Sequence, residues 1–306
     1  MTRVLVTPRS MTQHDLDDLE ELAPLRERGF ELISGPPGRL PSEDELTDLV
    51  RGVDGWIAGV ETITATVLDN ADRLRVISRN GVGADAIDER AAKARGVQIL
   101  LARGSNARGV AELTLGLLLT AVRDIPAAVT AMRAARWERT LGTEVADHTV
   151  GIVGYGSIGR IVADLVTAIG GRVLAHDAYA TVPAELAVPD LSALFRCSTV
   201  VTLHTPPPAD GTPLVTAELI AAMRPGSVLI NTARAGLIDE AAALQALESG
   251  RLRSYAVDAF ASEPPELTPL LTHPHTIMTP HLGGYTDASV RRATVGAVDG
   301  LLSVLS

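Results

Sequence analysis

The sequence predicts an α/β protein with two doubly wound parallel-sheet domains. Short apolar runs alternate with amphipathic segments along nearly the whole chain, which is typical of βαβ units. A length of 306 residues suffices for two domains. The chain is 46% hydrophobic but only 3% aromatic. Aliphatic residues must therefore build the cores, which suits parallel strands covered by helices.

The first half of the chain opens with a predicted strand, RVLVT at 3–7, and an amphipathic helix over 11–29. FELIS, GWIAG and RVISR predict further strands, and the capping-box spacing of Ser42 and Glu45 predicts another helix start. The segment 108–135 begins apolar on nearly every side, so its helix should be buried. It is central in one domain or shared between subunits. We favour a homodimer interface near 108–125.

The second half repeats the alternation after a brief joint near 100–102. Asp239 and Gly250 mark the start and stop of a helix, and a last helix begins near Thr286. Strands are predicted at Thr149–Val153, Arg172–His176, Thr199–Leu203, Ser227–Asn231, Ser254–Asp258 and Thr276–Thr279.

Composition argues against several classes of partner. The net charge is −10 and no Lys/Arg block occurs, so we expect neither nucleic acid nor a membrane as partner. The longest apolar run, Leu113–Val122, is too short to span a bilayer. The single cysteine, Cys197, is expected to be buried, and with no visible signal peptide the predicted location is the cytoplasm. No ligand spacing predicts a metal site.

A glycine motif, VGIVGYGSIGR, lies between a predicted strand and helix, with Gly154, Gly156 and Gly159 in dinucleotide-binding spacing. The glycines allow a tight turn, and the N–H groups of Ser157 and Ile158 then face a pyrophosphate. Asp177 ends the next strand, about 20 residues on, where a ribose-binding acid is expected. No arginine follows it directly, so the sequence predicts NAD rather than NADP.

Further polar residues follow other predicted strands, whose carboxyl ends share one sheet edge. Arg234 has the planar fork that binds a carboxylate, and His281 can exchange a proton near neutral pH with Glu263 behind it. Taken singly, these three also fit a surface cation, a buried histidine and a loop carboxylate. The remaining candidates on the cofactor side are His204, Thr205, Pro206, Asp258 and Gly283.

Several stretches together resemble the D-isomer-specific 2-hydroxyacid dehydrogenases, from about Trp56 to the C-terminus. They are SRNGVGADAID, GSNARGVAELTLGLLL, VGIVGYGSIGR, LINTARAGLIDE, VDAFASEPP and TPHLGG. The resemblance implies a Rossmann NAD-binding domain over 101–283, inserted into a flavodoxin-like substrate domain formed by 1–100 and completed by 284–306.

The resemblance also implies roles for single residues. Arg234 would hold the substrate carboxylate, and His281 would be the acid/base with Glu263 behind it. Backbone N–H groups of Val82 and Gly83 would bind the substrate, with Asn80 nearby. For the remaining residues, Asp258 would bind the nicotinamide carboxamide, Thr232 and Ala233 would line the cofactor site, and Trp137 would reach the partner subunit's active site.

The predicted function is NAD-dependent interconversion of a D-2-hydroxy acid and its 2-oxo acid. A D-3-phosphoglycerate dehydrogenase-type enzyme and a non-catalytic, NAD-sensing protein of the corepressor type are the alternatives. Phosphoglycerate dehydrogenases commonly carry an arginine where Gly59 lies here, followed by Glu61. We therefore expect a small unphosphorylated substrate with Glu61 facing its pocket, although Arg79, Arg133, Arg136 and Arg139 leave a second anion open.

Overall fold

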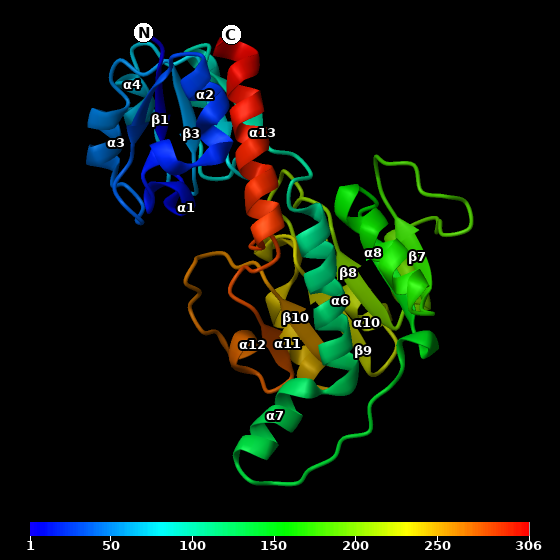
Figure 1. The fold of residues 1–306 in the computed structure, drawn as a ribbon. Helices are drawn as coiled ribbons and strands as arrows, with labels where there is room; N and C mark the ends of the chain where they lie inside the picture. The colour runs from blue at the N-terminus through cyan, green and yellow to red at the C-terminus, as the bar shows by residue number, and fades with distance from the viewer. Residues whose placement is uncertain (306) are drawn as a thin grey trace. The chain divides into compact units, whose positions relative to one another are not determined.

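The computed structural model describes residues 1–305 and divides the chain into two compact units. The first contains Met1–Asn106 and the chain from Thr286 onward, and the second contains Ala107–Tyr285. Each unit is one parallel sheet with helices on both faces, which confirms the predicted α/β class (Figure 1). The two units divide between Asn106 and Ala107, a few residues past the joint predicted near 100–102.

The first unit has a five-stranded sheet in the order β2-β1-β3-β4-β5. All its ladders are parallel, and register pairs Leu5 with both Ile33 and Trp56. The strands are β1 (Arg3–Val6), β2 (Glu31–Ser34), β3 (Gly55–Ala58), β4 (Val76–Arg79) and β5 (Gln98–Leu101).

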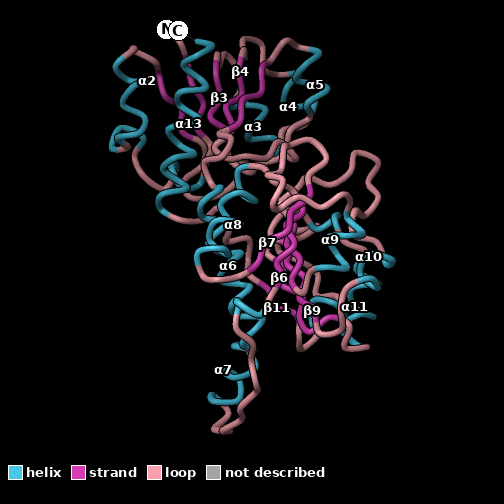
Figure 2. Tube along the Cα trace, turned by 90° about the vertical axis from the view of Figure 1, so that its right-hand side faces the viewer, coloured by secondary structure: helices cyan, strands magenta, loops and turns pink. Residues whose placement is uncertain are grey.

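Two apolar layers sandwich this sheet because strand side chains alternate between its faces. Trp56 and Ile77 lie in the layer beneath α3 (Glu43–Leu49), α4 (Ala65–Asp69) and α5 (Glu89–Ala94). Ile57 and Val76 lie in the opposite layer with α2 (Ala23–Glu27) and α13 (Asp287–Leu305). Figure 2 shows the two groups of helices on opposite sides of the strands. The predicted capping box of Ser42 and Glu45 starts α3.

The single helix predicted over 11–29 was wrong. The chain forms four short pieces instead: α1 (Arg9–Thr12), η1 (Leu16–Asp18), η2 (Glu20–Leu22) and α2. The Asp15 carboxylate accepts a hydrogen bond from the N–H of Asp17, and Leu19 adopts an extended backbone. A local side-chain bond of this kind competes with helix continuation. Leu22 and Leu25 are still fully buried, so the apolar side chains of this segment face the core although the segment is not one continuous helix.

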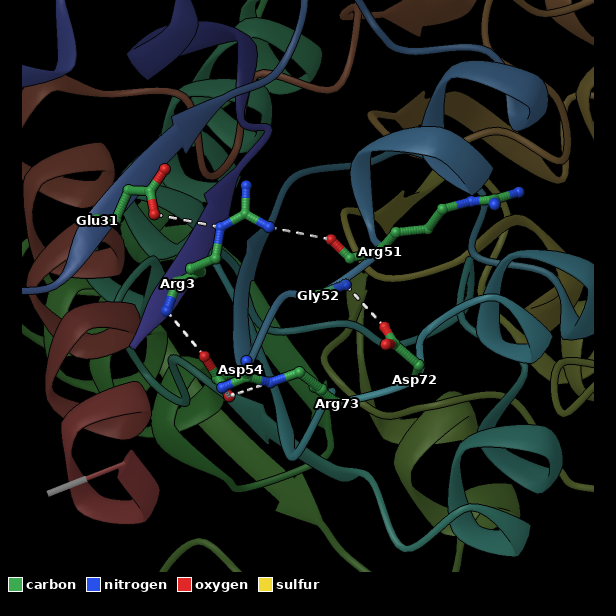
Figure 3. A network of polar contacts seen from close by, with 7 residues as sticks. All are labelled: Arg3, Glu31, Arg51, Gly52, Asp54, Asp72 and Arg73. Carbon is green, nitrogen blue, oxygen red and sulfur yellow. Dashed lines mark hydrogen bonds and ion pairs between the residues drawn. The ribbon is translucent and has the colours of Figure 1, made fainter. Parts of the chain in front are cut away.

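Polar contacts connect the amino ends of the first unit's strands (Figure 3). The Arg3 N–H donates to the Asp54 carboxylate at 2.8 Å, and the Arg73 guanidinium donates to the same carboxylate at 2.7 Å. The Arg3 guanidinium also donates to Glu31 at 3.2 Å. The Arg3–Glu31 pair is exposed, and a pair of that kind stabilises a fold by no more than about 1 kcal/mol. These contacts occupy the edge of the sheet opposite to the carboxyl ends.

The second unit has a six-stranded parallel sheet in the order β11-β10-β9-β8-β6-β7. Strands β6, β7 and β9 have the predicted limits, β8 and β11 differ by one residue at one end, and β10 begins two residues and ends one residue earlier than predicted. The strands are β6 (Thr149–Val153), β7 (Arg172–His176), β8 (Val200–Leu203), β9 (Ser227–Asn231), β10 (Leu252–Val257) and β11 (Thr276–Met278).

Helices cover both faces of this sheet as well. Ile152 and Ile230 lie in the layer with α6 (Ala107–Arg123) and α8 (Ser157–Ala168). Val201 and Leu229 lie in the opposite layer with α9 (Leu191–Cys197), α10 (Ala217–Ala222), α11 (Glu240–Glu248) and α12 (Pro269–Thr272). Cys197, at the end of α9, is exposed, so the expected burial of this thiol was wrong.

The apolar helix beginning near residue 108 is a core helix of the second unit. Ala111 and Leu117 of α6 belong to the buried sheet layer and Val110 is buried as well, so packing within the unit accounts for much of its apolar start. The chain then bends at Asp124 (φ 52°) into α7 (Ile125–Arg133), which extends away from the sheet (Figure 1). Within residues 1–305 no single helix combines the length and hydropathy needed to cross a membrane. Helices α6 and α7 meet that test only as a pair bent by 65°.

Candidate active site

The glycine motif forms the turn from β6 into α8, and its close contacts explain two of its glycines. A Cβ on Gly154, whose φ is 96°, would lie 2.4 Å from the carbonyl oxygen of His204. A Cβ on Gly159 would lie 2.0 Å from the carbonyl oxygen of Gly154. Gly156 has no atom within 4 Å of such a Cβ, so open space lies beside it. The turn is tightly packed at Gly154 and Gly159, whereas the open space beside Gly156 leaves room for a bulky group.

The start of α8 has the properties of an anion site. Gly156 is its N-cap and provides no side-chain hydrogen bond, whereas α9 and α11 begin with capping aspartates. The first N–H groups of a helix have no partner within the helix, and the helix dipole places positive charge there. Ser157 is exposed and Ile158 partly so. These N–H groups fit the pyrophosphate of a dinucleotide.

Asp177 follows β7, and its carboxylate is fixed by three backbone N–H groups. Tyr155 donates to one oxygen at 2.6 Å, while Tyr179 and Ala180 each donate to the other at 2.7 Å. Burial raises the pKa of Asp177, but these three bonds and nearby His176 outweigh it, so the net pKa lies below its usual value. An ionised, fixed carboxylate beside the glycine turn suits ribose hydroxyls and repels a phosphate.

His204 lies directly after β8 and is held in a neutral form. Its backbone N–H donates to the carbonyl oxygen of Val153 at 2.7 Å, and the ring nitrogen Nε2 lies 3.0 Å from the Thr202 hydroxyl. Its Nδ1 is buried and has no hydrogen-bond partner within residues 1–305. Burial lowers the pKa of the imidazole to about 3. Thr205 is partly exposed beside it and Pro206 is exposed.

The loop after β9 carries Arg234 and is organised by a residue that sequence reasoning missed. Asn231 is fully buried; its amide donates to the Arg234 carbonyl at 2.8 Å, and its side-chain oxygen accepts from the Ala233 N–H at 3.1 Å. The hydroxyls of Thr232 and Thr114 lie 3.1 Å apart, which connects the loop to α6. The polar last residue of the apolar strand SVLIN was the only sequence signal for this role.

His281 and Glu263 form a direct pair. Nδ1 of His281 lies 2.6 Å from the Glu263 carboxylate, and both side chains are about half exposed. A carboxylate can only accept, so Nδ1 carries a proton and Nε2 is the nitrogen that Glu263 does not engage. His281 has a left-handed backbone (φ 52°), which is uncommon for a residue with a side chain. The structure thus brings together the predicted acid/base and its carboxylate.

Asp258 follows β10 and holds the loop that carries His281. One oxygen accepts from the Thr279 hydroxyl at 2.6 Å and from the Leu282 N–H at 2.8 Å, and the other accepts from the Gly283 N–H at 2.8 Å. The side chain is buried. From the sequence, Asp258 was predicted only to bind the nicotinamide carboxamide, and its role in positioning the His281 loop was missed. Binding of the carboxamide stays a prediction.

The predicted substrate contacts outside this sheet belong to the first unit. Asn80, Val82 and Gly83 follow β4; the Asn80 N–H donates to the Ala58 carbonyl at 2.9 Å. Glu61, expected to face a pocket, is only 2% exposed. Trp137, in the loop after α7, is 80% exposed. In the described part of the chain, no three His, Cys, Asp or Glu side chains gather in a way that holds a metal ion.

Comparison with known proteins agrees with this arrangement. A family model described as D-isomer specific 2-hydroxyacid dehydrogenase, NAD binding domain, matches residues 115–283. The chain is 35% identical over 274 residues to D-3-phosphoglycerate dehydrogenase of Methanocaldococcus jannaschii, covering 86% of this chain and 52% of that protein. It is 34% identical over 272 residues to hydroxypyruvate reductase of Thermotoga maritima, covering 86% and 88%.

The fold comparison gives the same picture. The crystal structure of the TT0316 protein from Thermus thermophilus has a TM-score of 0.87 and 34% identity, covering 99% of this chain and 97% of that one. The chain therefore has nearly the full length of this structure and of the reductase, but spans only about half the phosphoglycerate dehydrogenase, at 52%.

Proposed function

The chain belongs to the D-isomer-specific 2-hydroxyacid dehydrogenase family, and from this premise we propose that it interconverts a D-2-hydroxy acid and its 2-oxo acid with NAD. The observation that carries the proposal is the His281–Glu263 pair, 2.6 Å apart, in the same unit as the glycine turn and Arg234. A proton donor, a carboxylate-binding cation and a dinucleotide site are the three components that this reaction needs.

The cofactor is held by the carboxyl edge of the second unit's sheet. The turn at Gly154, Gly156 and Gly159 and the N–H groups of α8 bind the pyrophosphate, and Asp177 binds the ribose. The contacts that follow the other strands are His204, Thr205, Pro206, Thr232, Ala233, Asp258 and Gly283. Asp177 selects NAD, since a 2′-phosphate would meet a fixed negative charge.

The reaction divides between cofactor and protein. When bound, NADH supplies the hydride for the carbonyl carbon of the 2-oxo acid. Arg234 binds the substrate carboxylate through its planar fork. His281 donates the Nε2 proton to the carbonyl oxygen, and in the reverse direction takes it from the hydroxyl. Glu263 holds the ring and stabilises the imidazolium.

The first unit contributes to substrate binding in this proposal. The N–H groups of Val82 and Gly83, with Asn80 beside them, receive the substrate. We expect the substrate to carry no phosphate for two reasons. The nearby cation is already hydrogen bonded, since the Arg79 guanidinium donates to the Asn80 carbonyl at 3.0 Å. The neighbouring Glu61 is a carboxylate, which repels a phosphate. A phosphate would therefore meet an acidic side chain rather than an unengaged arginine.

We propose that two chains associate through the exposed side of α6 and α7. Apolar side chains of large size remain exposed there: Leu119, Ile125, Val129 and Met132. A groove in the same region is lined by Arg123, Ile125, Val129 and Met132. A second copy of this chain would cover them, and Trp137 would then lie near its partner. The single cysteine supports a cytoplasmic location as part of the proposal.

The proposal is tested by following NADH oxidation with purified protein and a panel of 2-oxo acids. We expect turnover with glyoxylate and hydroxypyruvate, and lower kcat/KM with 3-phosphohydroxypyruvate. A clear preference for the phosphorylated compound would instead support the phosphoglycerate dehydrogenase type. NADH binding with no turnover on any acid would support the corepressor type and contradict the enzyme.

A further inference from the structure

The turn that carries Arg234 is held from both faces of the second unit's sheet. On the side of α6, the hydroxyls of Thr232 and Thr114 lie 3.1 Å apart. On the other side, the Asn231 side chain accepts from the Ala233 N–H and donates to the Arg234 carbonyl. These contacts fix the backbone that presents the Arg234 guanidinium, so whatever fixes Asn231 also fixes Arg234.

Tyr255 of β10 is placed to reach Asn231. Register pairs Tyr255 with Leu229 and Val257 with Asn231, so these side chains share the sheet face covered by α9 to α12. Neighbouring strands lie about 4.8 Å apart, and two residues of a strand span about 6.6 Å. A tyrosine side chain is long enough to cross that diagonal. The Tyr255 hydroxyl accordingly forms a hydrogen bond with the Asn231 side chain.

The Tyr255 hydroxyl lies in an otherwise apolar layer. Tyr255 is 3% exposed and belongs to the same buried cluster as Leu229, Leu237 and Val257. Burial raises the pKa of its phenol above the ordinary value, so the hydroxyl keeps its proton at neutral pH. A buried hydroxyl costs free energy unless it is hydrogen bonded, and a phenylalanine would fill the same space without that cost. The oxygen therefore contributes through its partner, Asn231.

The Asn231 amide uses both of its N–H groups and its oxygen. The oxygen accepts from the Ala233 N–H at 3.1 Å, and one N–H donates to the Arg234 carbonyl at 2.8 Å. The second N–H is the donor that remains for the Tyr255 oxygen. Without the phenol oxygen this buried N–H would have no partner. An unsatisfied buried donor is costly, so the amide would turn in search of another acceptor and release the Arg234 carbonyl.

We propose that Tyr255 is a positioning residue for substrate binding, which acts through Asn231 to hold the Arg234 turn in the conformation that receives the substrate carboxylate. The inference rests on the proposed function and adds to it a residue that touches neither substrate nor cofactor. The carboxylate is present before and during the reaction, so misalignment of Arg234 weakens the ground state and the transition state alike. The effect therefore belongs in KM and in inhibitor affinity, and not in kcat.

The test is Tyr255→Phe, which removes one oxygen and keeps the ring. We expect KM for glyoxylate and Kd for oxamate, a carboxylate inhibitor, to rise about three- to tenfold, the worth of one hydrogen bond. The kcat value and Kd for NADH should stay unchanged. Oxamate binding is measured on the protein–NADH complex by NADH fluorescence, so this readout does not depend on turnover. Wild-type oxamate affinity in Tyr255→Phe would overturn the inference.

Ser227→Ala is the matched control. Ser227 begins β9, the strand that ends at Asn231, and its hydroxyl donates to the Arg224 carbonyl at 2.6 Å. This variant also loses one hydroxyl hydrogen bond in the second unit, but at the opposite end of the strand. It should lower stability to urea and keep the oxamate affinity. If it weakened oxamate binding as much as Tyr255→Phe does, general destabilisation would explain both results and the positioning role would be wrong.

A double-mutant cycle tests the route through Asn231. Asn231→Ala already removes the amide from the turn, so adding Tyr255→Phe should change oxamate affinity no further. An equal loss in both backgrounds would show that Tyr255 acts by another route, which contradicts the inference. Should Asn231→Ala not fold, the comparison of Tyr255→Phe with Ser227→Ala decides the matter.

Failure of the proposed function is a separate result. If wild-type protein neither oxidises NADH with any 2-oxo acid nor binds oxamate, the proposed function is wrong and the inference is wrong with it. If wild-type protein does both and Tyr255→Phe behaves identically, only the role of Tyr255 is wrong.

Discussion

Acidification should destabilise the second unit through His204, and the size of the effect follows from its surroundings. The folded imidazole has a pKa of about 3 because it is buried, whereas an unfolded histidine has a pKa of about 6.5. Between these values the unfolded chain binds a proton that the folded chain does not. The contribution of His204 to the free energy of unfolding is therefore fully present well above about pH 6.5 and falls as the pH drops toward 3. At pH 5 the loss from this residue is about 2 kcal/mol.

The measurement is urea unfolding of wild-type protein and His204→Asn at pH 7.5 and pH 5, followed with a probe in the second unit. Other groups titrate alike in both proteins, so the difference isolates His204. We expect the variant to be the less stable at pH 7.5 but to lose about 2 kcal/mol less on acidification. Equal losses in the two proteins would refute the reasoning and would place His204 in contact with water in the folded state.

Five other substitutions test the cofactor site, the chemistry and the assembly. Asp177→Ala should narrow the gap between NADH and NADPH affinity in a fluorescence titration; an unchanged gap would remove Asp177 from the ribose site. Gly159→Ala should weaken NADH binding at least about tenfold, because its Cβ would lie 2.0 Å from a backbone oxygen; wild-type affinity would show that the turn yields. His281→Ala should lower kcat by roughly two to four orders of magnitude while NADH binding is kept. Glu263→Gln should move the pH profile of 2-oxo acid reduction to lower pH. An unshifted profile would show that Glu263 does not stabilise the protonated His281. Met132→Glu should shift sedimentation toward the monomer, and a wild-type protein that already sediments as a monomer at micromolar concentration would contradict the dimer.

Local sequence predicted the sheet of the second unit well because each of its strands is a compact apolar run closed by turn residues. Strand β9, for example, begins after the glycine turn at 226 and ends at Asn231. The same reasoning failed over 11–29, where Leu16, Leu19 and Leu22 have helical spacing. Periodicity reports which side chains face a core, but a capping side chain such as Asp15 decides whether the backbone continues as a helix.

Some residues of the candidate site could be predicted from the sequence and others could not. Residues that carry reactive groups, such as His281 and Arg234, were found from their chemistry and from their places after strands. Residues that orient them were missed, because their partners are distant in sequence. Thr114 of α6 meets Thr232 across more than 100 positions, and the Asp258 carboxylate binds a loop that begins 21 residues later. Neither contact leaves a periodic trace in the sequence.

The position of α13 in the chain has a consequence for biosynthesis. This helix contributes Leu301 and Leu305 to the core of the first unit, where a Cβ on Gly55 would lie 2.6 Å from Leu305. A ribosome makes it only after all of the second unit has been synthesised. Until then one apolar face of the first sheet stays uncovered in the nascent chain, while the second unit already has every strand and helix it needs. The nucleotide-binding half can thus fold first, and the other half completes its core only once its final helix has been made.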